Sequence, residues 1–309
     1  MYGYSPLRYP GGKARVANFL RLLCRTNSLV DFTYVEPYAG GASVALVMLV
    51  LREARRVHIN DLDVGVSDFW RCVSDNSEEL CSLVLETPLT ISEWKAQKAK
   101  WKDPSATSLE RGFATFYLNR TNRSGIISGA GVIGGLEQRG QWGMDARFNR
   151  EDLVKRIRAV ARLSHRMEVT SEDAVGLLER LSPQLGSQAL VYLDPPYYNK
   201  GQQLYRNAYE PSDHAAVAQA VSRLDSPWVV SYDDTPEIRE LYREYRSLAY
   251  KLEYSAQKRY SGGEIMFFSH GLSIPDVTNP ARIPQSSFSD HMRALARQRA
   301  EADAAQWSL

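Results

Sequence analysis

Four consecutive residues, Asp194-Pro195-Pro196-Tyr197, stand directly after a short apolar run at 189–193. In open α/β sheets, ligands bind beyond the carboxyl ends of the strands. The Asp194 carboxylate and the Pro195 carbonyl can both accept hydrogen bonds from an amino group on a flat ring, and Tyr197 can stack on the face of that ring. The tetrapeptide therefore indicates a site that activates an exocyclic amino group. A proline-stiffened turn capped by Asp194 is the structural alternative.

A second group of such residues follows the apolar run at 32–36, where glycines would let a ligand approach the start of the next helix. About 20 residues later Asp61 ends the next predicted strand, at the distance from which an acid holds ribose hydroxyls. The turn lacks the GxGxxG pattern of dinucleotide sites, and Leu7 stands where a P-loop would have its first glycine, so Lys13 is not a P-loop lysine. The residues of this turn that we expect to face a ligand are Glu36, Pro37, Tyr38, Gly40 and Gly41.

The composition is that of an ordinary globular protein, with 309 residues of which 44% are hydrophobic and 24% charged. The net charge of +2 argues against a purely electrostatic nucleic-acid binder. Three cysteines without CxxC spacing and five dispersed histidines predict neither a disulfide framework nor a metal site. The longest apolar run, residues 42–51, is about half a membrane span. We therefore expect a cytoplasmic protein that uses no metal and no membrane.

The elements that must position these residues alternate in type. Residues 1–70 show the order strand, glycine turn, helix and strand that is typical of a parallel α/β sheet, and residues 167–272 return to the same alternation. Apolar runs predict further strands at 189–193, 228–232, 248–254 and 264–270.

The region between these two parts has a different texture. Residues 71–166 contain helical patterns at 92–102, 108–118 and from Arg150 onward, and 7 of the 19 residues from 125 to 143 are glycine. That stretch is either a plain flexible loop or a segment whose backbone approaches a ligand closely. We expect one domain from 1–70 and 167–272, an inserted domain at 71–166, and a C-terminal tail at 273–309 that includes a charged, alanine-rich helix at 290–306.

Five motifs and their order together resemble the DNA adenine-N6 methyltransferases of the Dam type, over about residues 5–270. LRYPGGK at 7–13 is similar to the N-terminal LKWxGGK element of that family, VEPYAGGAS at 35–43 to its VEPFxGxGS turn, and INDLD at 59–63 to its acidic segment. FYLNR at 116–120 is similar to the element that opens the recognition domain, and DPPY at 194–197 completes the set. The cofactor turn precedes DPPY, as in the α-type amino-methyltransferases.

The resemblance implies a Rossmann-like methyltransferase fold, with a seven-stranded, mostly parallel sheet and an inserted helical and glycine-rich target-recognition domain. It implies S-adenosylmethionine as the cofactor, direct methyl transfer to N6 of an adenine flipped out of double-stranded DNA, and no metal. It places Tyr9 and Lys13 against the cofactor, residues 36–41 around its methionine part and Asp61 on its ribose. Asp173 would meet the cofactor adenine, and Asp194 would bridge the cofactor and the target base.

DNA contact is predicted for the inserted region, because residues 118–166 contain ten basic and four acidic residues. The basic helix after Arg150 would by itself be explained as a solvated face. The side chains that we predict to contact DNA are Asn119, Arg120, Asn122, Arg123, Arg139, Lys258 and Arg259.

The sequence departs from the GATC-reading members after FYLNR. Those members continue with an aromatic residue, Asn and Gly, whereas this chain continues with TNRSGIISGAGVIGG, so we expect a separate branch with an open target sequence. Cytosine-N4 and glutamine methyltransferases typically have Ser or Asn before the two prolines, and Asp194 favours adenine; an RNA substrate stays open. The non-enzymatic alternative is a dead methyltransferase domain acting as a DNA-binding regulator or decoy, against which Lys13, Asp61 and Asp194 argue. We expect a monomer or weak dimer, with or without a partner restriction nuclease.

Overall fold

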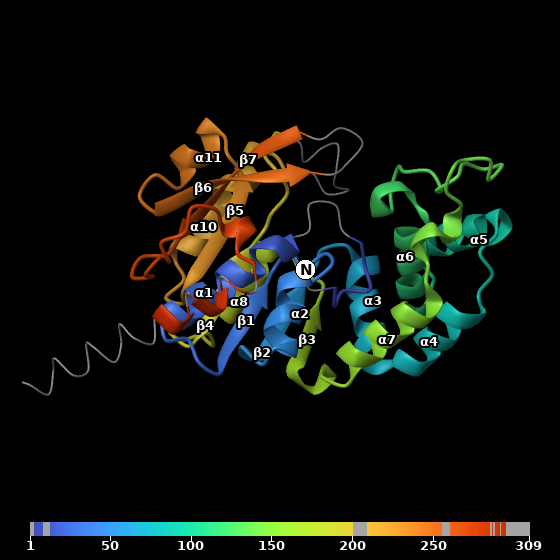
Figure 1. The fold of residues 1–309 in the computed structure, drawn as a ribbon, viewed down its shortest axis with the longest axis horizontal. Helices are drawn as coiled ribbons and strands as arrows, with labels where there is room; N and C mark the ends of the chain where they lie inside the picture. The colour runs from blue at the N-terminus through green and yellow to red at the C-terminus, as the bar shows by residue number, and fades with distance from the viewer. Residues whose placement is uncertain are drawn as a thin grey trace, which may run out of the picture.

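The computed structural model describes residues 3–8, 13–199, 209–254, 260–284, 286, 288–290 and 292–294. They form a seven-stranded sheet with the strand order β3-β2-β1-β4-β5-β7-β6 (Figure 1). The strands are β1 (Phe32–Glu36), β2 (Ala54–Asn60), β3 (Met167–Thr170), β4 (Ala189–Leu193), β5 (Trp228–Asp233), β6 (Arg246–Tyr254) and β7 (Tyr260–Phe268).

The sheet is parallel except for β7, which runs antiparallel to both β5 and β6. Its central strand β4 is buried along its whole length, which explains why its sequence is a continuous apolar run rather than an alternating one. The strands β2 and β3 lie on one side of β1, and the chain then crosses to β4 on its other side. The strand order therefore reverses between β1 and β4. The predicted α/β class and the mostly parallel, seven-stranded sheet are confirmed.

Helices cover both faces of the sheet and bury alternate residues of each central strand. Leu190 and Tyr192 of β4 face the core formed with α1 (Ala17–Thr26) and α2 (Ser43–Val50). Val191 and Leu193 face the opposite core. That second core is formed with α8 (Ala174–Leu181), α10 (Pro211–Ser222) and α11 (Pro236–Leu241).

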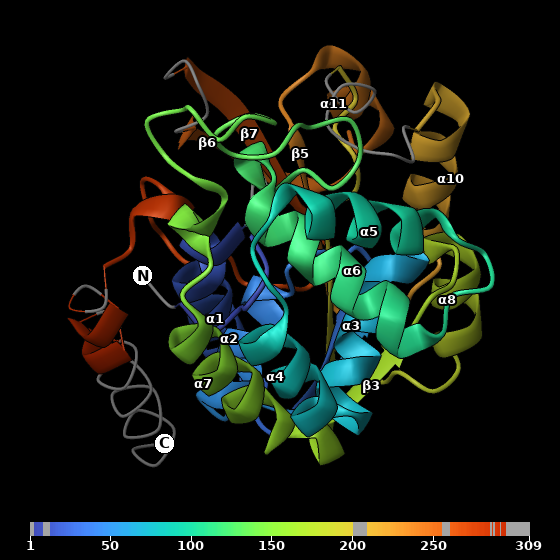
Figure 2. The ribbon, with the colours of Figure 1, turned by 90° about the vertical axis from the view of Figure 1, so that its right-hand side faces the viewer.

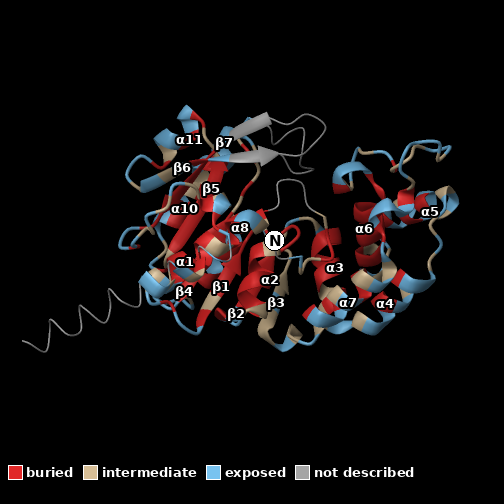
Figure 3. Cartoon of the chain, viewed as in Figure 1, coloured by how far each residue is buried: buried red, intermediate tan, exposed pale blue. Residues whose placement is uncertain are grey.

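The inserted helices pack beside the sheet rather than on it, and Figure 2 shows them from their outer side. They are α3 (Val64–Asp75), α4 (Ser77–Glu86), α5 (Ile91–Lys102), α6 (Ser108–Thr121) and α7 (Arg150–Ala161), with the short 3-10 helices η2 (Arg123–Gly125), η3 (Met144–Arg147) and η4 (Ser164–Arg166). One apolar core continues from the sheet into these helices, as the buried residues in Figure 3 show. The helix α6 is buried along its second half, from Gly112 to Thr121.

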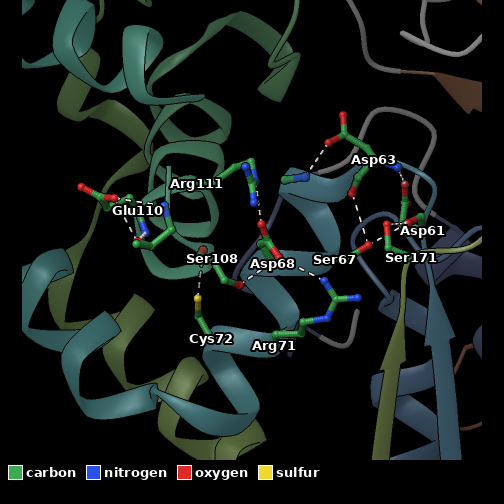
Figure 4. A network of polar contacts seen from close by, with 12 residues as sticks. Asp61, Asp63, Ser67, Asp68, Arg71, Cys72, Ser108, Glu110, Arg111 and Ser171 are labelled. Atoms are coloured by element: carbon green, nitrogen blue, oxygen red, sulfur yellow. Dashed lines mark hydrogen bonds and ion pairs between the residues drawn. The ribbon is translucent and has the colours of Figure 1, made fainter. Parts of the chain in front are cut away.

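The helices α3 and α6 approach each other closely. A Cβ atom on Gly112 would lie 2.8 Å from the backbone carbon of Asp68, so only glycine fits at this crossing. Figure 4 shows that the buried Asp68 carboxylate then joins the two helices by accepting hydrogen bonds from Ser108 Oγ at 2.8 Å and Arg111 Nε at 2.6 Å. The helix α6 is therefore fixed to α3, the helix that follows Asp61 in the chain.

In both views, the glycine-rich segment between α6 and η3 lies in the upper part of the molecule, as do β6 and β7 (Figures 1 and 2). The chain after β7 includes η5 (Pro280–Arg282). It packs on the core through the buried side chains of Leu272, Ile283 and Phe288, and the Arg21 guanidinium stacks over the Phe288 ring. Of the helix predicted at 290–306, the described residues 290 and 292–294 are helical.

Candidate active site

The carboxyl ends of β1, β2 and β4 lie side by side because these three strands are parallel and in register. Val35 of β1 is paired with both His58 of β2 and Val191 of β4. The predicted cofactor turn, Asp61 and the DPPY segment therefore leave the sheet at the same edge, although they are up to 160 positions apart in sequence. This edge includes the point between β1 and β4 where the strand order reverses, which is where ligands bind in such sheets.

The glycine turn after β1 is held by the acid that follows β2. Gly40 and Ala42 both adopt a left-handed backbone with a φ of 47°, a conformation that is uncommon for alanine. Asp61 Oδ2 accepts a hydrogen bond from the Gly40 amide at 2.8 Å, and its Oδ1 accepts one from the Asp63 amide at 2.9 Å. Burial raises the pKa of Asp61 to about 7, although both amides act in the opposite direction.

Asn60, which carried no prediction, connects the ends of three strands. Its Nδ2 donates to the Pro37 carbonyl at 2.9 Å and to the Glu172 carbonyl at 3.0 Å, while its Oδ1 accepts from Thr170 Oγ1 at 2.8 Å. Because Asn60 is buried and uses both ends of its amide, it fixes the turn after β1 relative to the chain after β3.

The predicted residues around this turn differ in what they contact. Glu36 is buried, accepts a hydrogen bond from the Ala45 amide at 3.0 Å, and has a pKa that burial raises well above its usual value. The Tyr38 hydroxyl lies 3.0 Å from the hydroxyl of Tyr209. Asp173 is the N-cap of α8, with its Oδ1 accepting from two backbone amides of that helix. Tyr9, Lys258 and Arg259 lie outside the described residues, so their predicted roles stay predictions.

The ammonium group of Lys13 joins the N-terminal motif to the DPPY segment. Lys13 Nζ lies 3.2 Å from Asp194 Oδ1 and donates to the Tyr197 hydroxyl at 3.2 Å. The Lys13 side chain is 3% exposed, whereas that of Asp194 is 20% exposed. Burial alone would lower the pKa of Lys13, but the surrounding acidic groups raise it well above its usual value, so the ammonium stays charged.

Three residues that the sequence did not single out complete this network. Glu264 of β7 accepts hydrogen bonds from Lys13 Nζ at 2.8 Å and from the Tyr197 hydroxyl at 2.7 Å. Ser231 of β5 donates to Asp194 Oδ1 at 2.9 Å, and its oxygen lies 2.9 Å from the hydroxyl of Tyr192. No motif or spacing marks Glu264, Ser231 or Tyr192, because each lies inside an apolar strand.

The two oxygens of the Asp194 carboxylate have different surroundings. Oδ1 meets both Lys13 and Ser231, while Oδ2 has no hydrogen-bond partner among the residues that the structure describes. Burial raises the pKa of Asp194 to about 6; Lys13 lowers it and Glu264 raises it further. One carboxylate oxygen is thus held in place while the other keeps its full capacity to accept a hydrogen bond.

The chain after Tyr197 is anchored to the end of β5. The Asp233 carboxylate accepts hydrogen bonds from the Tyr198 amide at 2.9 Å and the Asn199 amide at 3.1 Å. Pro195 and Pro196 donate no backbone hydrogen bond, so these two amides and the Asp194 side chain fix the course of the DPPY turn.

The sequence was compared with models of known protein families. The model of the D12 class N6 adenine-specific DNA methyltransferase family matches residues 9–259. The chain belongs to this family. It is therefore an adenine-specific DNA methyltransferase that acts on N6, as the motifs predicted, and this activity implies S-adenosylmethionine as methyl donor. The placement in a branch distinct from the GATC-reading members stays a prediction.

Solved structures give only distant likenesses to this methyltransferase. The rRNA methyltransferase aviRa from Streptomyces viridochromogenes is 16% identical, with 87% of this chain and 90% of that chain covered and a TM-score of 0.38. A SAM-dependent methyltransferase from Agrobacterium tumefaciens is 10% identical, with 83% and 62% covered and a TM-score of 0.36. These scores add nothing to the family assignment. The comparison with curated protein sequences gave no match.

Three of the residues predicted to contact DNA are buried in the inserted region. Asn119 and Asn122 are at most 1% exposed and Arg120 is 8% exposed. Asn119 bonds to both backbone groups of Arg8 at 2.7 and 2.6 Å and to the Gly125 carbonyl at 2.8 Å. In this structure these side chains are buried and bond to protein atoms, and their contact with DNA stays a prediction.

Arg120 and Asn122 are likewise committed to main-chain carbonyls. Arg120 Nε donates to the Pro6 carbonyl at 2.7 Å, and Asn122 Nδ2 donates to the Ile126 carbonyl at 2.9 Å. Burial lowers the pKa of Arg120 to about 9, and neighbouring arginines lower it further. By contrast, Arg123 and Arg139 are exposed, and their contact with DNA stays a prediction.

Two predicted absences concern metal and membrane. Among the described residues, no group of three or more His, Cys, Asp or Glu side chains is arranged to hold a metal ion. None of the helices that the structure describes combines the length and apolar character needed to cross a membrane.

Proposed function

We propose that the methyltransferase binds S-adenosylmethionine and a flipped-out adenine at the edge formed by the carboxyl ends of β1, β2 and β4. The observation that carries this proposal is the buried contact between Lys13, from the N-terminal motif, and Asp194, from DPPY. It brings the two most distant predicted parts of the site within hydrogen-bond reach of one another.

The residues of the glycine turn fit the cofactor on two grounds. The left-handed backbone at Gly40 and Ala42 leads directly into the N-terminus of α2, where the carboxylate of the methionine part can approach the main chain. Each Asp61 oxygen accepts one amide hydrogen bond and keeps a lone pair for a ribose hydroxyl. We assign residues 36–41 to the methionine part of the cofactor and Asp61 to its ribose.

S-adenosylmethionine, when bound, supplies an electrophilic methyl group. We assign to Asp194 Oδ2 and the Pro195 carbonyl the two hydrogen bonds that the adenine amino group donates, which draw the nitrogen toward tetrahedral geometry and free its lone pair. N6 takes the methyl group directly and loses one proton, for which the raised pKa makes the Asp194 carboxylate a suitable acceptor. The Tyr197 ring stacks on the adenine and offsets part of the cost of flipping.

DNA contact is assigned to the exposed arginines of the inserted region. Arg123, Arg139 and Arg147 are exposed on η2, the glycine-rich segment and η3, respectively. Asn119, Arg120 and Asn122 would then shape this surface from within. We propose the division made from the sequence, with catalytic residues in 1–70 and 167–272, target recognition in 71–166 and a tail from 273.

Expression in a methylation-free bacterial host, followed by modification-sensitive sequencing of its genome, tests the proposal. We expect N6-methyladenine within one consensus sequence, and its loss with Asp194→Ala. A genome without N6-methyladenine, together with DNA binding by the purified protein, would favour the dead regulator instead. Calorimetry with S-adenosylmethionine separates the enzyme from the dead regulator. For the enzyme we expect the wild-type protein to bind the cofactor and Lys13→Ala to bind it more weakly, whereas a regulator has no need to bind it.

A further inference from the structure

Glu264 is a buried charge that the proposed function does not use. It lies in β7 opposite Asp233 of β5 and Tyr250 of β6, and it is 1% exposed. A carboxylate in such a place is costly unless charges and hydrogen bonds compensate it. The hydrogen-bond partners of Glu264 therefore indicate its role.

Each oxygen of Glu264 has a different partner. Oε1 accepts the hydrogen bond of the Tyr197 hydroxyl at 2.7 Å, and Oε2 accepts that of Lys13 Nζ at 2.8 Å. The Lys13 ammonium also lies 5.1 Å from the centre of the Tyr197 ring. One carboxylate thus fixes the far end of the predicted stacking ring and the predicted cofactor-binding lysine at once.

We propose that Glu264 is a positioning residue for methyl transfer, which orients the Tyr197 ring and keeps Lys13 from forming a one-to-one pair with Asp194. This inference rests on the proposed function of Asp194 and Tyr197.

The distances support the second part of this role. The buried Glu264 carboxylate and the partly exposed Asp194 carboxylate share one ammonium. The contact of Lys13 with Glu264, at 2.8 Å, is shorter than its contact with Asp194, at 3.2 Å. Without Glu264, the full charge of Lys13 would fall on Asp194 and weaken it as an acceptor for the adenine amino group. With Glu264 in place, Asp194 keeps a net negative charge beside the reacting nitrogen.

The other groups around this network are accounted for. Ser231 and Tyr192 approach from the sheet on the side of Asp194, and the Glu36 carboxyl group, whose pKa burial raises, lies near it. The Tyr250 hydroxyl is buried and has no hydrogen-bond partner within the described part of the chain. Tyr250 therefore offers a matched control, because Tyr250→Phe removes a neighbouring hydroxyl without removing a hydrogen bond.

The decisive variant is Glu264→Gln, which keeps the size of the side chain and removes its charge. We expect kcat to fall about 100-fold, as for the loss of one preorganised electrostatic contact, while KM for DNA changes less than threefold. The acid limb of the kcat/KM profile should move to lower pH, since Glu264 no longer raises the pKa of Asp194. Tyr250→Phe should match wild type in both readouts.

The variant Tyr197→Phe tests the orienting contact and also serves if Glu264→Gln does not fold. It keeps the stacking ring and removes the hydroxyl that donates to Glu264, so we expect kcat to fall about tenfold and the melting temperature to fall only slightly, with the protein still folded at the assay temperature. The variant with both substitutions should be no slower than Glu264→Gln alone, because each substitution removes the same interaction, the hydrogen bond from the Tyr197 hydroxyl to the Glu264 carboxylate.

Wild-type kcat in Glu264→Gln or in Tyr197→Phe would overturn the inference, as would strictly additive losses in the double variant. If the acid limb of the kcat/KM profile stays at the same pH in Glu264→Gln, the inference that Glu264 keeps Lys13 from pairing one-to-one with Asp194 is overturned. Failure of the proposed function has a different signature, because wild-type protein would then leave adenine unmethylated, or Asp194→Ala would methylate it normally.

Discussion

The network around Asp194 at the sheet edge and the C-terminal end of α6 both bury polar side chains, but these side chains have different kinds of partner. At the sheet edge, Lys13, Asp194 and Glu264 meet other ionisable side chains, and Asp194 keeps one oxygen available. In the inserted region, Asn119 and Asn122 bond mostly to backbone groups of neighbouring segments. Buried side chains that face one another can change partners when a ligand arrives, whereas those tied to the backbone hold the fold. The comparison predicts that substitutions will affect catalysis in one region and stability in the other.

The largest effect should follow from Asp194→Ala. This variant removes the acceptor for the adenine amino group, so we expect a loss of about 10³-fold or more in kcat. Transfer of labelled methyl groups from S-adenosylmethionine to DNA measures it. The fold should persist, because among the described residues the Asp194 carboxylate bonds only to the side chains of Lys13 and Ser231, and a thermal melt gives the control. Turnover at the wild-type rate would remove Asp194 from the mechanism.

The pH dependence of kcat/KM tests whether the charge of Asp194 matters. Its carboxylate is the accepting form, and its pKa is raised to about 6 by burial, so protonation in the free enzyme begins near pH 6 rather than near pH 4. We expect kcat/KM to fall about tenfold for each pH unit below 6.

Ser231→Ala should shift the pKa of Asp194 in the opposite direction to Glu264→Gln, and it therefore gives a second test of the pH dependence. The Ser231 hydroxyl stabilises the charged form of Asp194, so its removal should move the acid limb to higher pH. A limb that stays at the same pH in both variants would mean that another group controls the profile.

The sequence was informative about the sheet edge because its residues follow strands that the apolar pattern already reveals. Parallel pairing then brings the segments after β1, β2 and β4 together without further information. Glu264 could not be found in this way. It begins an apolar stretch of β7 that carries no turn or motif, and only the antiparallel pairing with β5 brings it to Lys13 and Tyr197.

The inserted region shows why polarity in a sequence does not establish exposure. Asn119, Arg120 and Asn122 were predicted to contact DNA because they lie in a basic stretch beside the glycine-rich segment. All three are buried. Asn119 and Arg120 bond to the backbone of the N-terminal segment 3–8, more than 110 positions away, and Asn122 bonds to the Ile126 carbonyl and to Trp94 Nε1. No local pattern contains a contact of that sequence separation. The packing of α6 on all sides is a tertiary property that its own residues do not reveal.

Asn119→Ala tests the structural role that the contacts of Asn119 indicate. It leaves the Arg8 amide, the Arg8 carbonyl and the Gly125 carbonyl without a partner in a buried place. We expect a loss of about 2–3 kcal/mol in the free energy of unfolding, measured with urea. The matched change Arg123→Ala removes an exposed side chain and should stay within about 0.5 kcal/mol. Equal stability of the two variants would contradict the assignment of Asn119 to the interior.

The smallest effect should come from a single exposed arginine on the glycine-rich segment. Arg139→Gln removes one positive charge without disturbing the core, so the slope of log K against log salt for DNA should decrease by about 1, and affinity should fall several-fold at physiological salt. Arg243→Gln, at a position just after α11 and paired with Glu240, removes the same charge from another part of the surface. Because a net-charge effect would act equally in both variants, a difference confined to Arg139→Gln places a DNA phosphate at the inserted region, and equal slopes would remove Arg139 from the interface.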